Sequence, residues 1–230
     1  APYFLGTPYR LRGQLNYGRT TAKNYFGLGS RGMADLTYPA EGRSFTRYSE
    51  YEAGLRAVQP DGLTHALYDK VDHERPWILW SLEREFLGGL LRPFVGLAFS
   101  YSVIRDYSGT VVDASGPGGQ PVKAPMADTR LKRDCQAGLV VGCQGGWDNW
   151  FRLAIAFDTR DFEPDPNSGV LAELSAELGS RALGSGYDYA RVLLSFRGFY
   201  SPFPSFADLV LGGRAVMQVQ TGGTPFFSMN

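Results

Sequence analysis

Side chains capable of acid–base or nucleophilic chemistry are few in this sequence, and they form no catalytic pattern. The 230 residues include only two histidines, His65 and His73, which flank a polar, loop-like stretch and are expected to be solvated. Neither a G-x-S-x-G nucleophile motif nor a G-x-x-x-x-G-K-S/T phosphate loop occurs in the sequence. We therefore predict that the chain is not an enzyme and that it binds no cofactor or metal.

The two cysteines, Cys135 and Cys143, lie close together in a stretch that also contains Gly138 and Gly142. This spacing suits a small hairpin closed by a disulfide in an oxidising compartment. Two free thiols are the alternative. A structural zinc site usually has four ligands, and the sequence contains neither C-x-x-C nor H-x-x-x-H.

The charge and hydropathy of the chain exclude several classes of protein. Lys and Arg together number 23, as do Asp and Glu, so the formal net charge is zero, and we expect no nucleic-acid partner. The mean hydropathy is −0.20, and no apolar run approaches the roughly 20 residues of a transmembrane helix. A transmembrane strand needs only about 9–11 residues with an apolar side chain at every second position, so a membrane location stays open.

Alternation of apolar and polar residues is the most informative pattern in the chain. It runs clearly through four segments of the second half and less clearly through four of the first half. These segments are 151–158, 170–178, 190–197 and 209–220, and then 10–17, 50–57, 78–85 and 95–103. Residues 31–38 and 63–70 are candidates for one or two more strands, whereas the Gly- and Pro-rich stretch 107–128 predicts a long irregular loop. No segment keeps a 3.6-residue period, so helices should be minor.

The alternation predicts an all-β fold, an antiparallel transmembrane β-barrel with about 8–10 strands in this chain. The segments are long, and aromatic residues gather near their ends, as in the girdles of membrane barrels. A water-soluble sandwich has the same period and is the alternative. In the barrel, Leu153, Ile155, Leu174 and Leu194 face lipid. The charged side chains on the other face line the interior, as a salt-bridge lattice or as a selective pore: Arg152, Glu173, Glu177, Arg191, Arg197 and Arg214.

Several short motifs, in order along the chain, resemble those of the BamA/TamA-type bacterial surface-antigen barrels. The sequence N-Y-F-G-L-G at 24–29 resembles one signature of that family. The sequence F-D-T-R-D at 157–161, followed by Pro164 and Gly169, resembles the family's D-x-R-D turn, with Asp158, Arg160 and Asp161 as its charged residues. Residues 187–191 and 209–214 resemble the two strands that follow, and 222–227 resembles the approach to a large inward loop. Together these motifs cover most of residues 8–227.

The resemblance implies a bacterial outer-membrane location and a non-catalytic role in the insertion or export of protein or lipid. It implies the lipid bilayer as a partner, together with other outer-membrane assembly components or polypeptide clients. A passive porin-like channel and a membrane anchor for a fused domain are the alternatives. The charged turn would cap a hairpin at the periplasmic rim or take part in the mechanism.

The family's loop motif, V/L-R-G-F/Y, is expected shortly after Phe227 and does not occur in the sequence, and the chain holds no periplasmic POTRA repeats. We therefore predict that residues 1–230 are an outer-membrane barrel domain, or a segment of a larger barrel that in this family has about 16 strands.

Overall fold

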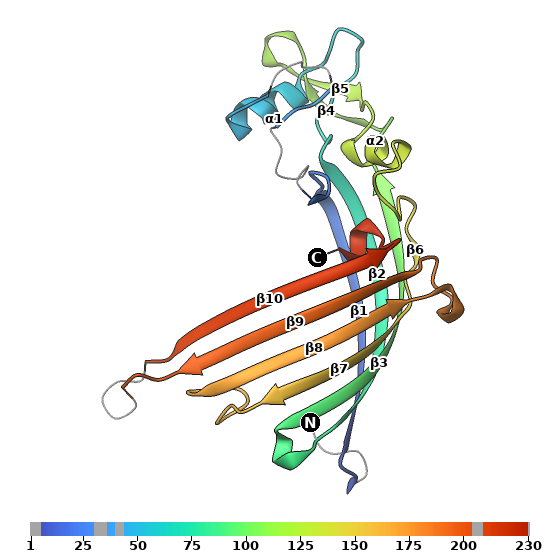
Figure 1. Cartoon of the computed structure of the whole chain (residues 1–230). Helices are drawn as coiled ribbons and strands as arrows, with labels where there is room; N and C mark the ends of the chain where they lie inside the picture. The colour runs from blue at the N-terminus through green and yellow to red at the C-terminus, as the bar shows by residue number, and fades with distance from the viewer. Residues whose placement is uncertain (1–5, 30–35, 40–43, 204–208, 230) are drawn as a thin grey trace. The chain divides into compact units, whose positions relative to one another are not determined.

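The computed structural model describes residues 6–29, 36–39, 44–203 and 209–229, and these are mainly antiparallel β-sheet (Figure 1). The main sheet has the order β1-β2-β3-β7-β8-β9-β10, with the short β6 paired to β3, and β4 and β5 form a separate two-stranded sheet. The strands are β1 (Tyr9–Asn24), β2 (Lys70–Arg84), β3 (Leu91–Asp106), β4 (Val111–Ser115), β5 (Pro121–Pro125), β6 (Gly146–Trp147), β7 (Trp150–Asp158), β8 (Gly169–Gly179), β9 (Tyr189–Tyr200) and β10 (Leu211–Gly222). The prediction of an all-β, antiparallel fold is confirmed.

Helices are few and short, as expected. The described α-helices are α1 (Tyr48–Arg56) and α2 (Arg130–Gln136), accompanied by single 3₁₀ turns. No helix in the described part of the chain is long and apolar enough to cross a membrane.

The chain divides into two compact units, which are described separately. The first unit comprises residues 1–16, 76–101 and 147–224, and it contains β7 to β10. The second unit comprises residues 17–75, 102–146 and 225–230, and it contains both α-helices and the β4–β5 hairpin.

The strands of the first unit pair in a register that gives the sheet two chemically different faces. Ile155 of β7 lies opposite Leu174 of β8, which lies opposite Leu194 of β9, which lies opposite Met217 of β10. Residues directly opposite one another share a face, so this row defines what we call the apolar face. The adjacent rows belong to what we call the polar face, which carries Arg152, Glu177 and Arg191 in one row.

The apolar face is the more exposed of the two. Leu174 and Leu194 expose 49% and 46% of their surface, whereas Ser175 and Glu177 on the polar face expose 2% and 4%. A water-soluble sandwich has the opposite arrangement, because it buries the apolar face of each sheet. The exposure therefore favours the barrel over the sandwich that the alternation left open.

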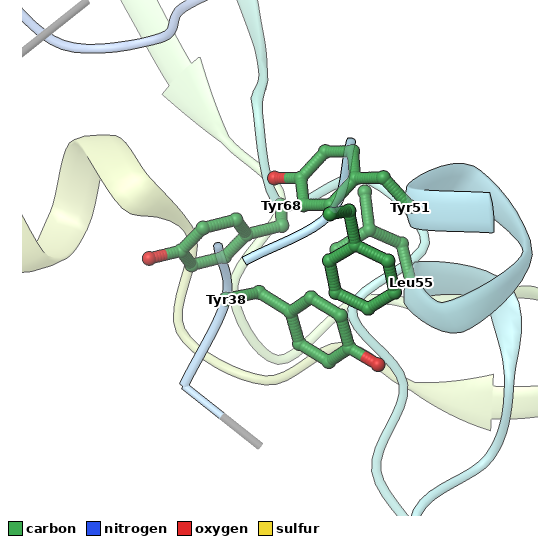
Figure 2. Close-up of a cluster of buried hydrophobic side chains, with 5 residues drawn as sticks. Tyr38, Tyr51, Leu55 and Tyr68 are labelled. Carbon is green, nitrogen blue, oxygen red and sulfur yellow. The ribbon is translucent and has the colours of Figure 1, made fainter. Parts of the chain in front are cut away.

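The segment 50–57, predicted as a strand, is instead most of helix α1. Tyr51 and Leu55 are one helical turn apart, and both are buried against Tyr38, Phe45 and Tyr68 (Figure 2). Apolar residues four positions apart fit a period of two as well as a helical period, so the sequence alone is ambiguous here. The helix forms because it directs both side chains into this aromatic cluster.

The stretch 107–128, predicted to be an irregular loop, contains the β4–β5 hairpin. Val111 to Ser115 pair with Pro125 to Pro121, and the turn between them includes Gly118 with a φ of 79°. Glycine adopts this left-handed conformation without steric cost, which explains why a Gly-rich sequence closes a hairpin here.

The two further strand candidates have different outcomes. Residues 63–70 do not form a strand of their own: Thr64 makes only isolated bridges, and β2 begins at Lys70. Of the candidate 31–38, residues 31–35 lie outside the described residues, and Leu36 makes an isolated bridge to Phe45.

His65 is not solvated, in contrast to the prediction. It is only 6% exposed, and its ring lies 5.2 Å from the ring of Tyr38 and 5.8 Å from that of Tyr68. Burial lowers the pKa of its imidazole, so the neutral form is favoured. His73 lies within β2, and its Nε2 is 3.2 Å from the Oγ of Ser102.

The two cysteines form a disulfide, with their Cα atoms 6.1 Å apart. Cys135 belongs to helix α2, so the bond joins the end of a helix to the following loop rather than closing a hairpin. Phe226 donates its backbone N–H to the carbonyl of Val141 within this loop at 2.9 Å. The disulfide therefore constrains a loop on which a later segment of the chain packs.

Candidate functional site

An open hollow of about 340 Å³ lies on the polar face of the first unit. Charged side chains from β1, β2, β3, β7 and β8, and from the turn after β7, line most of it. They are Arg12, Glu83, Arg92, Arg152, Arg160, Glu163 and Glu173. Both signs of charge are present, so the hollow is neither a simple cationic nor a simple anionic site.

The turn after β7 is built around the carboxylate of Asp158, whose side chain is only 3% exposed. Arg160 donates from Nε to Oδ1 at 2.9 Å and from Nη2 to Oδ2 at 2.8 Å, which is a two-point contact. Arg92 of β3 also contacts Asp158 and bridges to Glu163 at 2.8 Å. Each buried charge thus has partners of opposite sign, the condition under which a buried ion pair is tolerated.

The electrostatics of the turn follow from these contacts. The hydrogen bond from Arg160 to Asp158 raises the pKa of the arginine, and the hydrogen bond from Arg92 lowers the pKa of Glu163. All these groups are therefore charged at neutral pH. They act as fixed charges and not as proton donors or acceptors.

Asp161 stabilises the same turn through its backbone contacts. Its Oδ1 accepts hydrogen bonds from the backbone N–H groups of Phe162, Asn167 and Ser168 at 2.9, 3.0 and 3.2 Å. These hydrogen bonds lower the pKa of the Asp161 carboxyl, and the bond from Ser168 has the largest effect. Gly169 closes the turn with a φ of 109°, and a Cβ there would lie 2.5 Å from the carbonyl oxygen of Thr159. The structure therefore requires glycine at this position.

Three of the six residues predicted to line the interior meet in one cluster. Glu177 accepts from Arg152 Nε at 2.7 Å and from Arg191 Nη1 at 3.0 Å, so one carboxylate joins β7, β8 and β9. The side chain of Glu177 is 6% exposed. The cluster is the cross-strand ion pairing that the alternating charges suggested.

The other three predicted residues are not part of this cluster. Glu173 lines the hollow, two positions along β8 from Ser175. Arg197 of β9 lies directly opposite Arg214 of β10, so two like charges face each other across the strands, and both residues are exposed. The structure therefore places all six on the polar face, and whether that face lines a barrel interior stays a prediction.

Two important residues of the site escaped sequence analysis. Arg92 was missed because Pro93 and Phe94 follow it and interrupt the alternation at the start of β3. Glu163 lies in a turn, where no period applies. Their contacts join positions 71 residues apart in sequence, so only the pairing of β3 with β7 brings them together.

Strands β1 and β2 extend the ion pairs of the polar face. Arg10 contacts Glu85 and lies 3.6 Å from Glu83, and Arg12 also lies 3.6 Å from Glu83. Among the described residues, no group of three or more His, Cys, Asp or Glu side chains is placed to hold a metal ion. The arrangement as a whole offers a face of fixed charges of both signs.

The second unit has a separate buried ion pair. Arg130 of α2 donates from Nε to Oδ1 of Asp69 at 2.6 Å, and the hydroxyl of Tyr51 donates to Oδ2 of the same carboxylate at 2.5 Å. Burial and the hydrogen bond to Asp69 raise the pKa of Tyr51, so its hydroxyl stays protonated. This network joins α1, α2 and the segment before β2, and its role is structural.

The comparison with protein families identifies the class to which this fold and site belong. The family model of the Omp85 superfamily domain matches residues 1–229, which is nearly the whole chain. The chain belongs to the Omp85 superfamily, a family of outer-membrane assembly and translocation type, and the predicted resemblance is confirmed at the level of the superfamily. No curated protein and no solved structure matches the chain at a significant level.

Proposed function

We propose that this chain forms part of an outer-membrane β-barrel that helps to insert or export polypeptide or lipid, without covalent chemistry. The single observation that carries the proposal is the exposure of the sheet in the first unit. Its large apolar side chains are uncovered, while polar side chains on the opposite face are buried. Because uncovered apolar side chains are stable in lipid and costly in water, this supports a lipid-facing apolar face.

The polar face supports the non-catalytic part of the proposal. The charges around Asp158 and Glu177 are held in ion pairs by two or more partners each. A carboxylate held by two arginines in this way is positioned as a fixed charge, and both of its oxygens are occupied by ion pairs. A surface of fixed charges and hydroxyl groups instead interacts with a passing chain through water and through transient hydrogen bonds.

The proposed role is tested with the complete natural protein in liposomes. An unfolded β-barrel client is added from urea, and its insertion is followed as the fraction that becomes protected from protease. We expect insertion to be faster than in empty liposomes and faster than in liposomes with a passive porin at the same protein-to-lipid ratio. Equal rates in all three samples would contradict the proposal.

The passive-channel alternative gives a different result in the same samples. A water-filled interior predicts stable ionic conductance across a planar bilayer, without faster client insertion. A membrane anchor predicts neither conductance nor faster insertion, although the protein would still resist extraction from the membrane by alkaline carbonate.

A further inference from the structure

Arg84 is a cationic side chain on the apolar face of the first unit. It is the last residue of β2, and it shares a face with Trp80 and Leu82 because side chains alternate along a strand. Trp80 and Leu82 are 50% and 38% exposed, and Arg84 is exposed as well. The polar face holds the neighbouring Glu83, which lines the charged hollow.

Two aromatic rings and a hydroxyl group hold the guanidinium of Arg84. Its Cζ lies 5.2 Å from the ring centre of Tyr9 and 4.6 Å from that of Phe86, and Nη1 donates to the Tyr9 hydroxyl at 3.2 Å. Among the described residues, no carboxylate forms an ion pair with Arg84, since the adjacent Glu83 and Glu85 pair with arginines of β1. The guanidinium has five N–H donors, and within the described part of the chain the Tyr9 hydroxyl is the one acceptor found for them.

The turn that follows β2 adds apolar surface close to this cation in the chain. Leu87 is 72% exposed, and its φ of 53° is unusual for a residue with a side chain. An exposed leucine, two aromatic rings and an arginine at the end of a strand form the combination found where a protein crosses from lipid to headgroups.

We propose that Arg84, with Tyr9 and Phe86, binds the phosphodiester of a membrane glycerophospholipid. The inference rests on the proposed function, because it requires the apolar face to lie in a bilayer. At the end of a membrane strand the abundant anion is the lipid phosphate, which matches the donor geometry of a guanidinium. The turn between β2 and β3 is short, and short turns of outer-membrane barrels are periplasmic, so the lipid belongs to the inner leaflet.

The test counts lipids that stay bound to the complete natural protein, by native mass spectrometry after mild detergent exchange from phosphatidylglycerol bilayers. We compare the wild type with Arg84→Gln and with Arg56→Gln as the control, because Arg56 is an exposed arginine of helix α1 outside the main sheet. We expect about fivefold weaker phosphatidylglycerol retention in Arg84→Gln, the loss typical of one interfacial cation, and no change in Arg56→Gln. Equal retention in Arg84→Gln and wild type overturns the inference.

Two further measurements separate the sources of failure. Wild-type protein is also prepared with diacylglycerol, which lacks the phosphate. Retention of diacylglycerol should be as weak as retention of phosphatidylglycerol by Arg84→Gln. Retention of diacylglycerol equal to that of phosphatidylglycerol overturns the inference even if the variant does not fold. Millimolar inorganic phosphate should not displace the lipid, and displacement would mean a simple anion site. Insertion of the protein into the bilayer is checked first, by protection from protease. A wild type that does not insert refutes the proposed function. If the protein inserts but retains lipid independently of Arg84, only this inference is refuted.

Discussion

A pair of adjacent leucines in β9 provides the sharpest test of which face contacts lipid. Leu194 belongs to the apolar face and lies between Leu174 and Met217, whereas Leu193 belongs to the polar face and lies between Ser175 and Gln218. Leu194→Arg and Leu193→Arg introduce the same side chain in place of the same residue type. The two variants therefore differ only in the face that receives the charge.

The expected magnitude follows from the position of these residues along the strand. Strand β9 has 12 residues from Tyr189 to Tyr200, so Leu194 is close to its middle. An arginine on the lipid face near the bilayer midplane costs about 2–4 kcal/mol. At Leu193 the new guanidinium lies on the face that carries Glu173 and Glu177, where carboxylates and water solvate it, and we expect a cost below about 1 kcal/mol.

The assay is equilibrium folding of the complete natural protein into phosphatidylcholine bilayers over a urea series, read by protection from protease. Leu194→Arg should lower the free energy of unfolding by about 2–4 kcal/mol relative to wild type, and Leu193→Arg should lie close to wild type. An equal or larger loss for Leu193→Arg would refute the assigned facing. Because the register moves as a unit, that result would invert every residue of the sheet together.

Three other outcomes are expected. Mass spectrometry of unreduced, denatured protein should show no alkylating reagent at Cys135 or Cys143, and two equivalents after reduction. Two equivalents before reduction would contradict the disulfide. Hydrogen bonds lower the folded-state pKa of Asp161, so this residue stabilises the turn above about pH 4 and loses that effect as the pH falls further. Limited proteolysis of the turn in the wild type should therefore increase at low pH. In Asp161→Ala the turn should be cleaved fast at all pH values. Asp69→Ala removes the carboxylate that pairs with the buried Arg130 and should destabilise the second unit by about 3–5 kcal/mol, as measured by thermal denaturation. Restored stability in the double variant Asp69→Ala, Arg130→Met would confirm that the unpaired charge is the cause.

Local periodicity was enough to predict the strands of the first unit. Residues 151–158, 170–178 and 190–197 alternate with few exceptions, Leu171 and Leu193 among them, and they correspond to most of β7, β8 and β9. Side chains alternate along any extended strand, so a residue's face relative to its neighbours depends only on its position. The family could also be predicted, because its motifs are short local sequences in a fixed order.

Local sequence does not decide the structure where it fits more than one conformation. Tyr51 and Leu55 fit both a strand and a helix, and the aromatic cluster around them selects the helix. The Gly- and Pro-rich sequence of the β4–β5 turn looks irregular in isolation, and the strand pairing on either side makes it a hairpin. His65 carries no clear local signal of burial, because the ring of Tyr38 reaches it only through the fold, although Tyr68 is close to it in sequence.

The sequence by itself determined which residues share a face of each strand and that Cys135 and Cys143 are close enough to bond, since both properties are set by a few consecutive residues. Only the tertiary structure decided which charges meet. Glu177 joins Arg152 and Arg191 because β8 lies between β7 and β9, and Arg92 reaches Glu163 across 71 residues of sequence. Ion pairs depend on distances of a few ångströms between side chains, and strand order and register set those distances, whereas sequence spacing does not.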